Sequence, residues 1–370
     1  MNLVICYFWM RIEVVSGMGG GFKQKAQVLG QKMQHDGNII TKTSYLVETY
    51  ALFVNVDNSV LGLNPIIEKF GYQFVSINLQ DFEKSFSHLV SLPKDFQSER
   101  NFVFADGKHS VSQEFCELIL NHQSFGHSAL KNKAIILLQR IKDFEQEVIK
   151  NTVSVGLAMQ VASELQDFSY SLIQQLRLHK NGDIACPIEF QIIKDSRRVS
   201  FRSLRQSKFH GHANLKLTSD DVIILSKTLT EKFVTNQLTE LAINNFNLSY
   251  EISDLKTRYI TLMTCLESLM NLGPHQITHT VSRHLALVIS KSVNEFQLNY
   301  TRIKQLYDIR SNIVHGGTIS EDLAKVTNEL HDKVRHAINY CIKLDIDKKS
   351  LFEKLNALGF GLQDDKKTEI

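Results

Sequence analysis

The chain has 370 residues, of which 43% are hydrophobic and 22% are charged, and its formal net charge at pH 7 is +3. These values are ordinary for a soluble globular protein, and the length is sufficient for two domains. The mildly basic balance is compatible with RNA binding but does not demand it, and the absence of a long apolar segment argues against a membrane protein.

The N-terminal apolar run, residues 1–10, has no basic residue before it and is interrupted by Arg11. It therefore predicts neither a signal peptide nor a membrane span. Two explanations stay open: an edge strand, or a start annotated upstream of a true start at Met10, Met18 or Met33.

The cysteines indicate a reducing compartment. They are odd in number, and none of them forms a Cys-x-x-Cys pair. We therefore expect reduced, mostly buried thiols and a cytoplasmic protein. The five cysteines are Cys6, Cys116, Cys186, Cys265 and Cys341.

Residues 1–205 are expected to form a mixed α/β module. Several segments are rich in β-branched and aromatic residues or alternate like strands. These predicted strands are 45–56, 72–77, 102–104, 188–193 and 198–201. Between them, residues 112–178 carry apolar side chains at helical spacing, with one stripe through 135–149 and a second through 157–172.

The segment 203–218 is basic and polar, and it is the expected domain boundary. The densest basic cluster lies in and just before it. Such a cluster could track an RNA backbone, each contact adding salt-sensitive affinity, but a solvated strand face explains it equally well. The RNA-binding candidates are Arg197, Arg198, Arg202, Arg205 and Lys208.

Residues 219–358 are predicted to be helical, with one break at Gly273-Pro274, and residues 359–370 are predicted to be a disordered tail. His275 and His279 stand four residues apart, a spacing that can bind a metal. No cysteine or acid stands at a matching spacing, so we expect no metal and no cofactor.

The segment 306–317 combines the most chemically useful side chains of the chain. Arg310, Asn312 and His315 lie near the end of a predicted helix, and the pair Gly316-Gly317 follows as its stop. A histidine can move protons near neutral pH, and an arginine can clamp a phosphate and stabilise the charge of a transition state. These are the residue types that a metal-free phosphodiester-cleaving site needs.

A second amphipathic helix is predicted after the glycines, with Ser320 as its N-cap and Glu321 and Asp322 in its first turn. Residues five apart on an ideal helix are separated by roughly 140°, so Arg310 and His315 do not share a face. Three features could still bring Arg310 and His315 to one site: the long arginine side chain, a frayed last turn of the helix, or a partner group supplied by a second protomer.

A structural role for the same residues is the competing interpretation. In that case the segment is a capped helix end, where His315 interacts with the last carbonyls. Arg310 then makes a surface ion pair with Asp308 or Glu321.

The run 306–316, LYDIRSNIVHG, closely resembles the signature of the HEPN superfamily, specifically its Apea-like branch. In that family an arginine, four to six variable residues and a histidine mark the ribonuclease site. Segments 265–269 and 282–288 resemble the two preceding helices of the family. The resemblance covers about residues 235–350, and residues 1 to about 200 resemble no family that we can name.

The resemblance implies a small helical bundle, usually dimeric, in which two copies of the motif face each other and cleave RNA without a metal. It places Arg310 and His315 at the catalytic positions. Asn312 would orient a phosphate or the histidine, and Glu267 matches an acidic position that often points toward the site. Many family members are toxins or phage-defence effectors, so an antiviral role follows by analogy.

The sequence therefore predicts an α+β protein, with a mixed α/β module at residues 1–205 and an all-α HEPN-like bundle at 219–358. The expected function is metal-independent RNA cleavage by a homodimer. One alternative is a bundle that dimerises and binds nucleotide or RNA without cutting it. Another is a structural or regulatory subunit that uses the bundle only for assembly. Solvent access discriminates them, because a catalytic pair must open into a shared cleft.

Overall fold

A computed structural model describes residues 32–35, 38–86, 90–91, 113–114, 135–141, 144–149, 152–153, 155–193, 198–204, 214–273 and 276–358. The predicted strand at 102–104 and the predicted tail at 359–370 lie outside these residues. The chain forms two compact units. The first comprises 1–170, 185–206 and 217–222, and the second comprises 171–184, 207–216 and 223–370.

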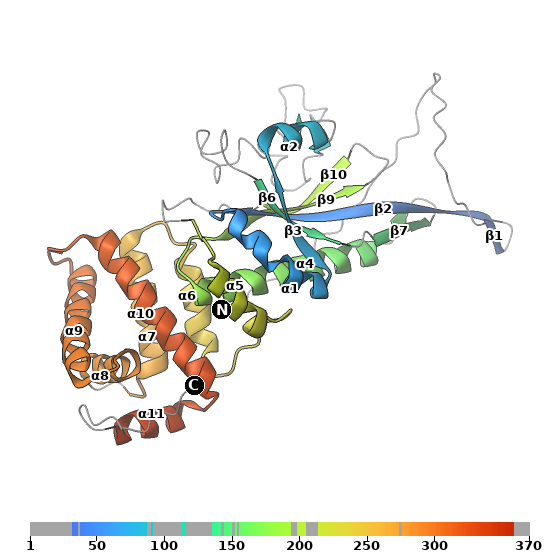
Figure 1. Ribbon diagram of the computed structural model, residues 1–370. Helices are drawn as coiled ribbons and strands as arrows, with labels where there is room; N and C mark the ends of the chain where they lie inside the picture. The colour runs from blue at the N-terminus through green and yellow to red at the C-terminus, as the bar shows by residue number, and fades with distance from the viewer. Residues whose placement is uncertain are drawn as a thin grey trace. The chain divides into compact units, whose positions relative to one another are not determined.

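The fold class is α+β, as the sequence predicted: strands dominate the first unit and helices dominate the second (Figure 1). In the first unit the described strands follow the order β3-β6-β2-β9-β10-β4-β5, with β1 and β7 also pairing with β2. All pairs are antiparallel except β10 with β4. The strands are β1 (Lys32–His35), β2 (Asn38–Val54), β3 (Tyr72–Ile77), β4 (Val90–Ser91), β5 (Gln113–Glu114), β6 (Ile135–Arg140), β7 (Phe144–Ile149), β8 (Thr152–Val153), β9 (Ala185–Ile193) and β10 (Arg198–Leu204).

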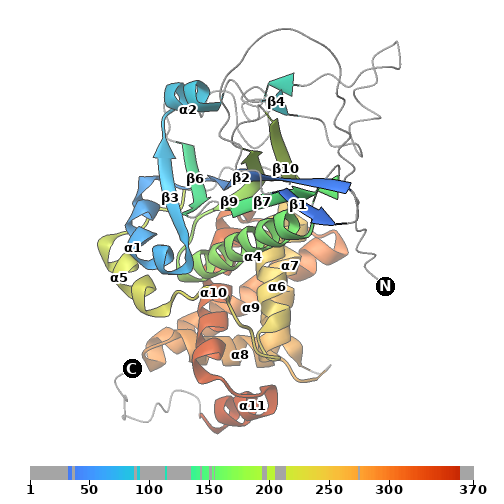
Figure 2. The same ribbon diagram turned by 90° about the vertical axis from the view of Figure 1, so that its right-hand side faces the viewer.

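Strand β2 is the centre of this sheet, and both of its faces are covered. Its run of β-branched and aromatic residues suits a strand, and successive side chains point to opposite faces. Tyr50 and Leu52 pack in one cluster with Phe82 of α2 (Leu79–Phe86). On the other side of the sheet lies α4 (Val155–His179), whose Phe168 stacks on Tyr72 with ring centroids 4.2 Å apart (Figure 1; Figure 2).

The prediction of helix at 135–149 is wrong, because these residues form β6 and β7. β6 lies between β2 and β3 and is buried on both faces, so its apolar residues follow one another without a gap. Apolar residues three or four apart occur by chance in such a run, which is why spacing alone indicated a helix. The second stripe, at 157–172, is helical in α4 as predicted, and β9 and β10 form the predicted strand pair.

The second unit is helical, and α7 carries much of its core. Leu262, Met263 and Leu266 are fully buried in one cluster with Leu306 and Val334. The helices are α5 (Ser219–Thr228), whose first four residues belong to the first unit, α6 (Glu240–Ser249), α7 (Leu255–Met270), α8 (Ile277–Ile289), α9 (Val293–His315), α10 (Leu323–Leu344) and α11 (Lys348–Ala357). Short helices in the first unit are η1 (Asn58–Leu63), α1 (Asn64–Ile67) and η2 (Glu68–Phe70).

Residues 171–184 belong to the helical unit, which the sequence did not indicate. The end of α4 is fixed there by side chains of α10. Arg335 Nε donates to the carbonyl of Arg177 at 2.7 Å, and Asn339 Nδ2 donates to the carbonyl of Leu178 at 2.8 Å. These bonds satisfy carbonyls that a helix end leaves without an intrahelical partner.

Among the cysteines that the structure describes, Cys265 and Cys341 are free thiols and are buried, whereas Cys186 is partly exposed. Burial raises the pKa of both buried thiols, so they are poor nucleophiles. Among the helices that the structure describes, none has the length and apolar character needed to cross a membrane.

Gly182 marks a close approach between two segments of the second unit. A Cβ atom at this position would lie 2.6 Å from Leu215 Cα and 2.9 Å from Leu215 N, and backbone atoms cannot rotate away. We expect Gly182→Ala to lower the free energy of unfolding by about 1–3 kcal/mol in urea titrations. Gly273→Ala is the matched control, because nothing lies within 4 Å of its Cβ position. Equal stability of the two variants would contradict this expectation.

Candidate functional site

Helix α9 remains regular up to His315 and then stops at the glycine pair, as predicted. Gly316 adopts the left-handed conformation with φ 74°, which glycine accepts at little cost. The N–H groups of Gly316 and Gly317 both donate to the carbonyl of Asn312, the latter at 2.7 Å. The last turn is therefore not frayed, and the expectation that fraying brings Arg310 and His315 together is wrong.

Asn312 has a structural use in this turn. Its Nδ2 donates to the carbonyl of Thr318 at 3.1 Å, and a Cβ atom on Gly317 would lie 2.8 Å from its Oδ1. The amide thus holds the segment after α9 against the helix end. Whether it also orients a phosphate, as the resemblance implies, remains a prediction.

The N-cap of α10 is Asp322, so the prediction of Ser320 at this position is wrong. The Asp322 carboxylate accepts from the N–H groups of Ala324 at 2.9 Å and Lys325 at 3.4 Å. Asp322 directly precedes the first apolar residue of the helix, Leu323, where the free N–H groups begin.

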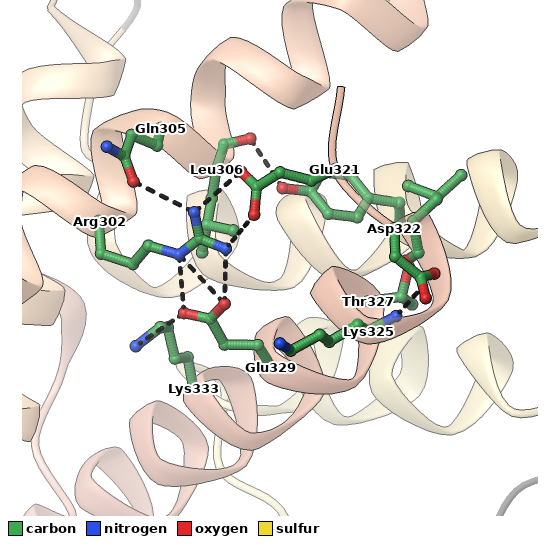
Figure 3. A network of polar contacts seen from close by, with 11 residues as sticks. Arg302, Gln305, Leu306, Glu321, Asp322, Lys325, Thr327, Glu329 and Lys333 are labelled. Atoms are coloured by element: carbon green, nitrogen blue, oxygen red, sulfur yellow. Dashed lines mark hydrogen bonds and ion pairs between the residues drawn. The ribbon is translucent and has the colours of Figure 1, made fainter. Parts of the chain in front are cut away.

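A network centred on Arg302 braces α9, the turn and α10 against one another (Figure 3). The guanidinium donates to Glu321 at 2.8 and 2.9 Å, to Glu329 at 2.8 Å and to Gln305 at 3.1 Å. Hydrogen bonds from Arg302 lower the pKa of Glu321. Burial alone would raise the pKa of Glu329, but Arg302 and Lys333 together lower it. Because Arg302 holds Glu321, the predicted pairing of Arg310 with Glu321 is wrong.

Arg310 instead faces Glu267, which lies in the last turn of α7. Its Nη2 is 3.7 Å from Glu267 Oε1, and the two side chains are 38% and 22% exposed. This is a loose ion pair, and the arginine side chain remains partly exposed. Arg310 Nε is buried and has no hydrogen-bond partner among the described residues. Two of the four predicted catalytic residues are thus brought together.

Tyr307 completes this group, and sequence reasoning missed it. It precedes Arg310 by three residues, so both side chains lie on the face of α9 that meets α7. Tyr307 is 5% exposed, and its hydroxyl makes no hydrogen bond of normal geometry with any described residue. Burial raises its pKa, and the negative charge of Glu267 raises it further. In the sequence this tyrosine looks like one more member of the apolar stripe.

His315 stands apart from these three residues. It is the last residue of α9 and is exposed. No hydrogen bond or ion pair joins it to Arg310 or to any other side chain that the structure describes. A single copy therefore presents the arginine and the histidine in different directions, roughly 140° apart around the helix.

The other candidate sites stay predictions. Arg197, Arg205 and Lys208 lie outside the described residues, while Arg198 and Arg202 lie on β10, where the backbone alone is described. Within the described ranges, no group of three His, Cys, Asp or Glu residues could hold a metal ion. His279 packs edge-on against Tyr300 with ring centroids 6.1 Å apart, and His275 is not among the described residues.

Comparisons with known proteins do not establish a family. No family model matches the chain, and no solved structure matches it. The "Putative ankyrin repeat protein R791" of Acanthamoeba polyphaga mimivirus is 30% identical over 141 residues, which is 38% of this chain and 44% of that protein. The chain thus spans less than half the length of this relative.

His284 of α8 fixes the end of α7 that carries Glu267. Its Nδ1 lies 3.3 Å from the carbonyl of Met270, and its Nε2 lies 3.0 Å from Asn356 Oδ1. Burial lowers the pKa of this ring below its usual value, an effect that outweighs the hydrogen bonds. The folded protein therefore holds the ring neutral at a pH where the unfolded chain already binds a proton.

We expect the contribution of His284 to the free energy of unfolding to be complete above about pH 6.5 and to fall as the pH drops below that value. Urea titrations between about pH 7.5 and pH 5.5 measure it. His284→Gln should lose stability less steeply over this range than the native protein. Identical pH slopes for both proteins would show that His284 is not held neutral.

Proposed function

We propose that the chain is a metal-independent endoribonuclease whose site is built on the end of α9. One observation carries the proposal. A half-exposed arginine, oriented by an acid from a neighbouring helix, precedes an exposed histidine by five residues at a braced helix end. The resemblance of segment 306–316 to the HEPN signature supports the same assignment.

Arg310 would stabilise the phosphate. Its guanidinium lies near Glu267 on one edge and its side chain is 38% exposed, so it can donate to phosphate oxygens without losing its existing partner. Charge builds on those oxygens in the pentacoordinate transition state, and a fixed positive group lowers its free energy.

His315 would move the protons. As a general base it takes the proton of the ribose 2′-hydroxyl, and the 2′-oxygen then attacks the phosphorus. As a general acid it gives a proton to the leaving 5′-oxygen as the P–O5′ bond breaks. The products are a 2′,3′-cyclic phosphate and a 5′-hydroxyl. One imidazole cannot hold both protonation states at once, whereas two copies of the chain supply two.

A homodimer also accounts for the geometry of α9. Because Arg310 and His315 point in different directions within one copy, a site that uses both requires a second α9 facing the first. The basic residues at 197–208 would bind the RNA backbone, and the cell would use the activity as a toxin or a phage-defence effector in the cytoplasm.

A second candidate is a module that binds RNA or nucleotide without cutting it. The observation that favours it is the lack of contact between Arg310 and His315 in one copy. In the residues that the structure describes, the helical unit lacks the regular repeat of an ankyrin array, which is what the name of the viral relative describes. The helices from α5 to α11 vary between 10 and 23 residues and follow no common repeat.

RNA cleavage by the purified protein in EDTA tests the proposal. His315→Ala should reduce cleavage by ~10²–10⁴-fold and Arg310→Ala by ~10²–10³-fold, because each removes a transition-state interaction. His336→Ala is the matched control, since His336 is an exposed histidine on α10 away from the helix end. The products should carry 2′,3′-cyclic phosphate ends.

Cleavage at the native rate by both His315→Ala and Arg310→Ala would contradict the proposal. RNA binding without cleavage by the native protein would favour the binding module instead.

A further inference from the structure

We propose that Tyr307 is a positioning residue of this site: its buried hydroxyl orients the Glu267 carboxylate, which in turn orients Arg310. The inference rests on the proposed function and extends it from the two motif residues to the group that sets the arginine in place.

Three polar groups converge between α7 and α9. The Tyr307 hydroxyl is buried beside the Glu267 carboxylate and makes no hydrogen bond of normal geometry, Arg310 Nε is buried and without a partner, and the Glu267 carboxylate lies 3.7 Å from Arg310 Nη2. Buried donors without acceptors are costly, and both of these donors lie beside the same carboxylate. A carboxylate has two oxygens, so it can serve both.

The charge of Glu267 acts on the tyrosine. After burial, the nearby carboxylate is the next largest cause of the raised pKa of Tyr307. The hydroxyl therefore stays protonated and can act as a donor at any physiological pH. When one Glu267 oxygen accepts from Tyr307, the other is left to the Nε and Nη2 edge of Arg310. The remaining edge of the guanidinium is then free for phosphate.

The effect on catalysis is one of orientation. An arginine has several rotatable bonds, and a 38% exposed side chain loses rotamer freedom when it binds phosphate. A carboxylate fixed by a rigid, buried ring holds the guanidinium near one direction before the substrate arrives. Tyr307 itself touches neither the RNA nor the reacting atoms.

Tyr259 on α7 offers the matched comparison. It is also buried between α7 and α9. Its hydroxyl donates to the carbonyl of Leu306 at 2.8 Å, so this hydrogen bond joins α7 to α9 and does not involve the Glu267 carboxylate. Tyr259→Phe removes a satisfied hydrogen bond, whereas Tyr307→Phe removes a hydroxyl whose partner is the carboxylate of the site.

The experiment compares RNA cleavage and urea unfolding for Tyr307→Phe, Tyr259→Phe, Glu267→Gln and the double variant Tyr307→Phe with Glu267→Gln. We expect Tyr307→Phe to lower kcat by about 10- to 100-fold and to lower the free energy of unfolding less than Tyr259→Phe does. Tyr259→Phe should be less stable with kcat unchanged. In the double variant the two effects should not multiply, since both act through one interaction.

Native kcat in Tyr307→Phe, or fully multiplicative effects in the double variant, would overturn the proposal. If the native chain does not cleave RNA, the proposed function fails by itself. The unfolding free energies then still decide the role of Tyr307. Non-additive effects of Tyr307→Phe and Glu267→Gln on stability support the hydroxyl–carboxylate pair, and strictly additive effects overturn it.

Discussion

The unbroken course of α9 up to His315 determines which side chains can meet. With 3.6 residues per turn, Tyr307 and Arg310 share the face that packs on α7, and Glu267 meets them there. The same helix turns His315 away from that face. The left-handed Gly316 and the bonds from the glycine N–H groups to Asn312 keep the last turn closed. Within one copy the regular helix therefore keeps the arginine and the histidine apart, which is why the proposed function calls for a second copy.

Two arginines of α9 differ in how far neighbouring carboxylates neutralise their charge and occupy their hydrogen-bond donors. Arg302 is held by two carboxylates at 2.8 Å, so its charge and its donors are already used between α9 and α10. Arg310 has one carboxylate at 3.7 Å and a more exposed side chain, 38% against 25%. Its positive charge is thus less neutralised and its donors are less occupied. The first arginine braces the helix end, and the second keeps the donors that the proposed contact with phosphate would use.

The sequence predicted an element correctly where its hydrophobic pattern matched a single type of secondary structure. It failed where tertiary packing determined the structure. The helices around the motif, the glycine stop and the strand pair β9–β10 follow from local patterns. The 135–149 stretch does not, because a strand buried on both faces loses the alternation that would identify it. The site divides in the same way: Arg310 and His315 come from a motif, whereas the approach of Glu267 to Arg310 depends on how two helices pack. The sequence did not single out Tyr307, because its place in an apolar stripe does not show that its hydroxyl lacks a hydrogen bond of normal geometry.

Mixing Arg310→Ala with His315→Ala tests most directly whether two copies share one site. Each variant alone should be inactive. Equal amounts should recover about a quarter of the native cleavage, because about half of the dimers are mixed and one of their two sites keeps both residues. Differently tagged chains that are captured together would show that subunits have exchanged. Mixed dimers that form without any recovery of cleavage would contradict a site built from the arginine of one copy and the histidine of the other.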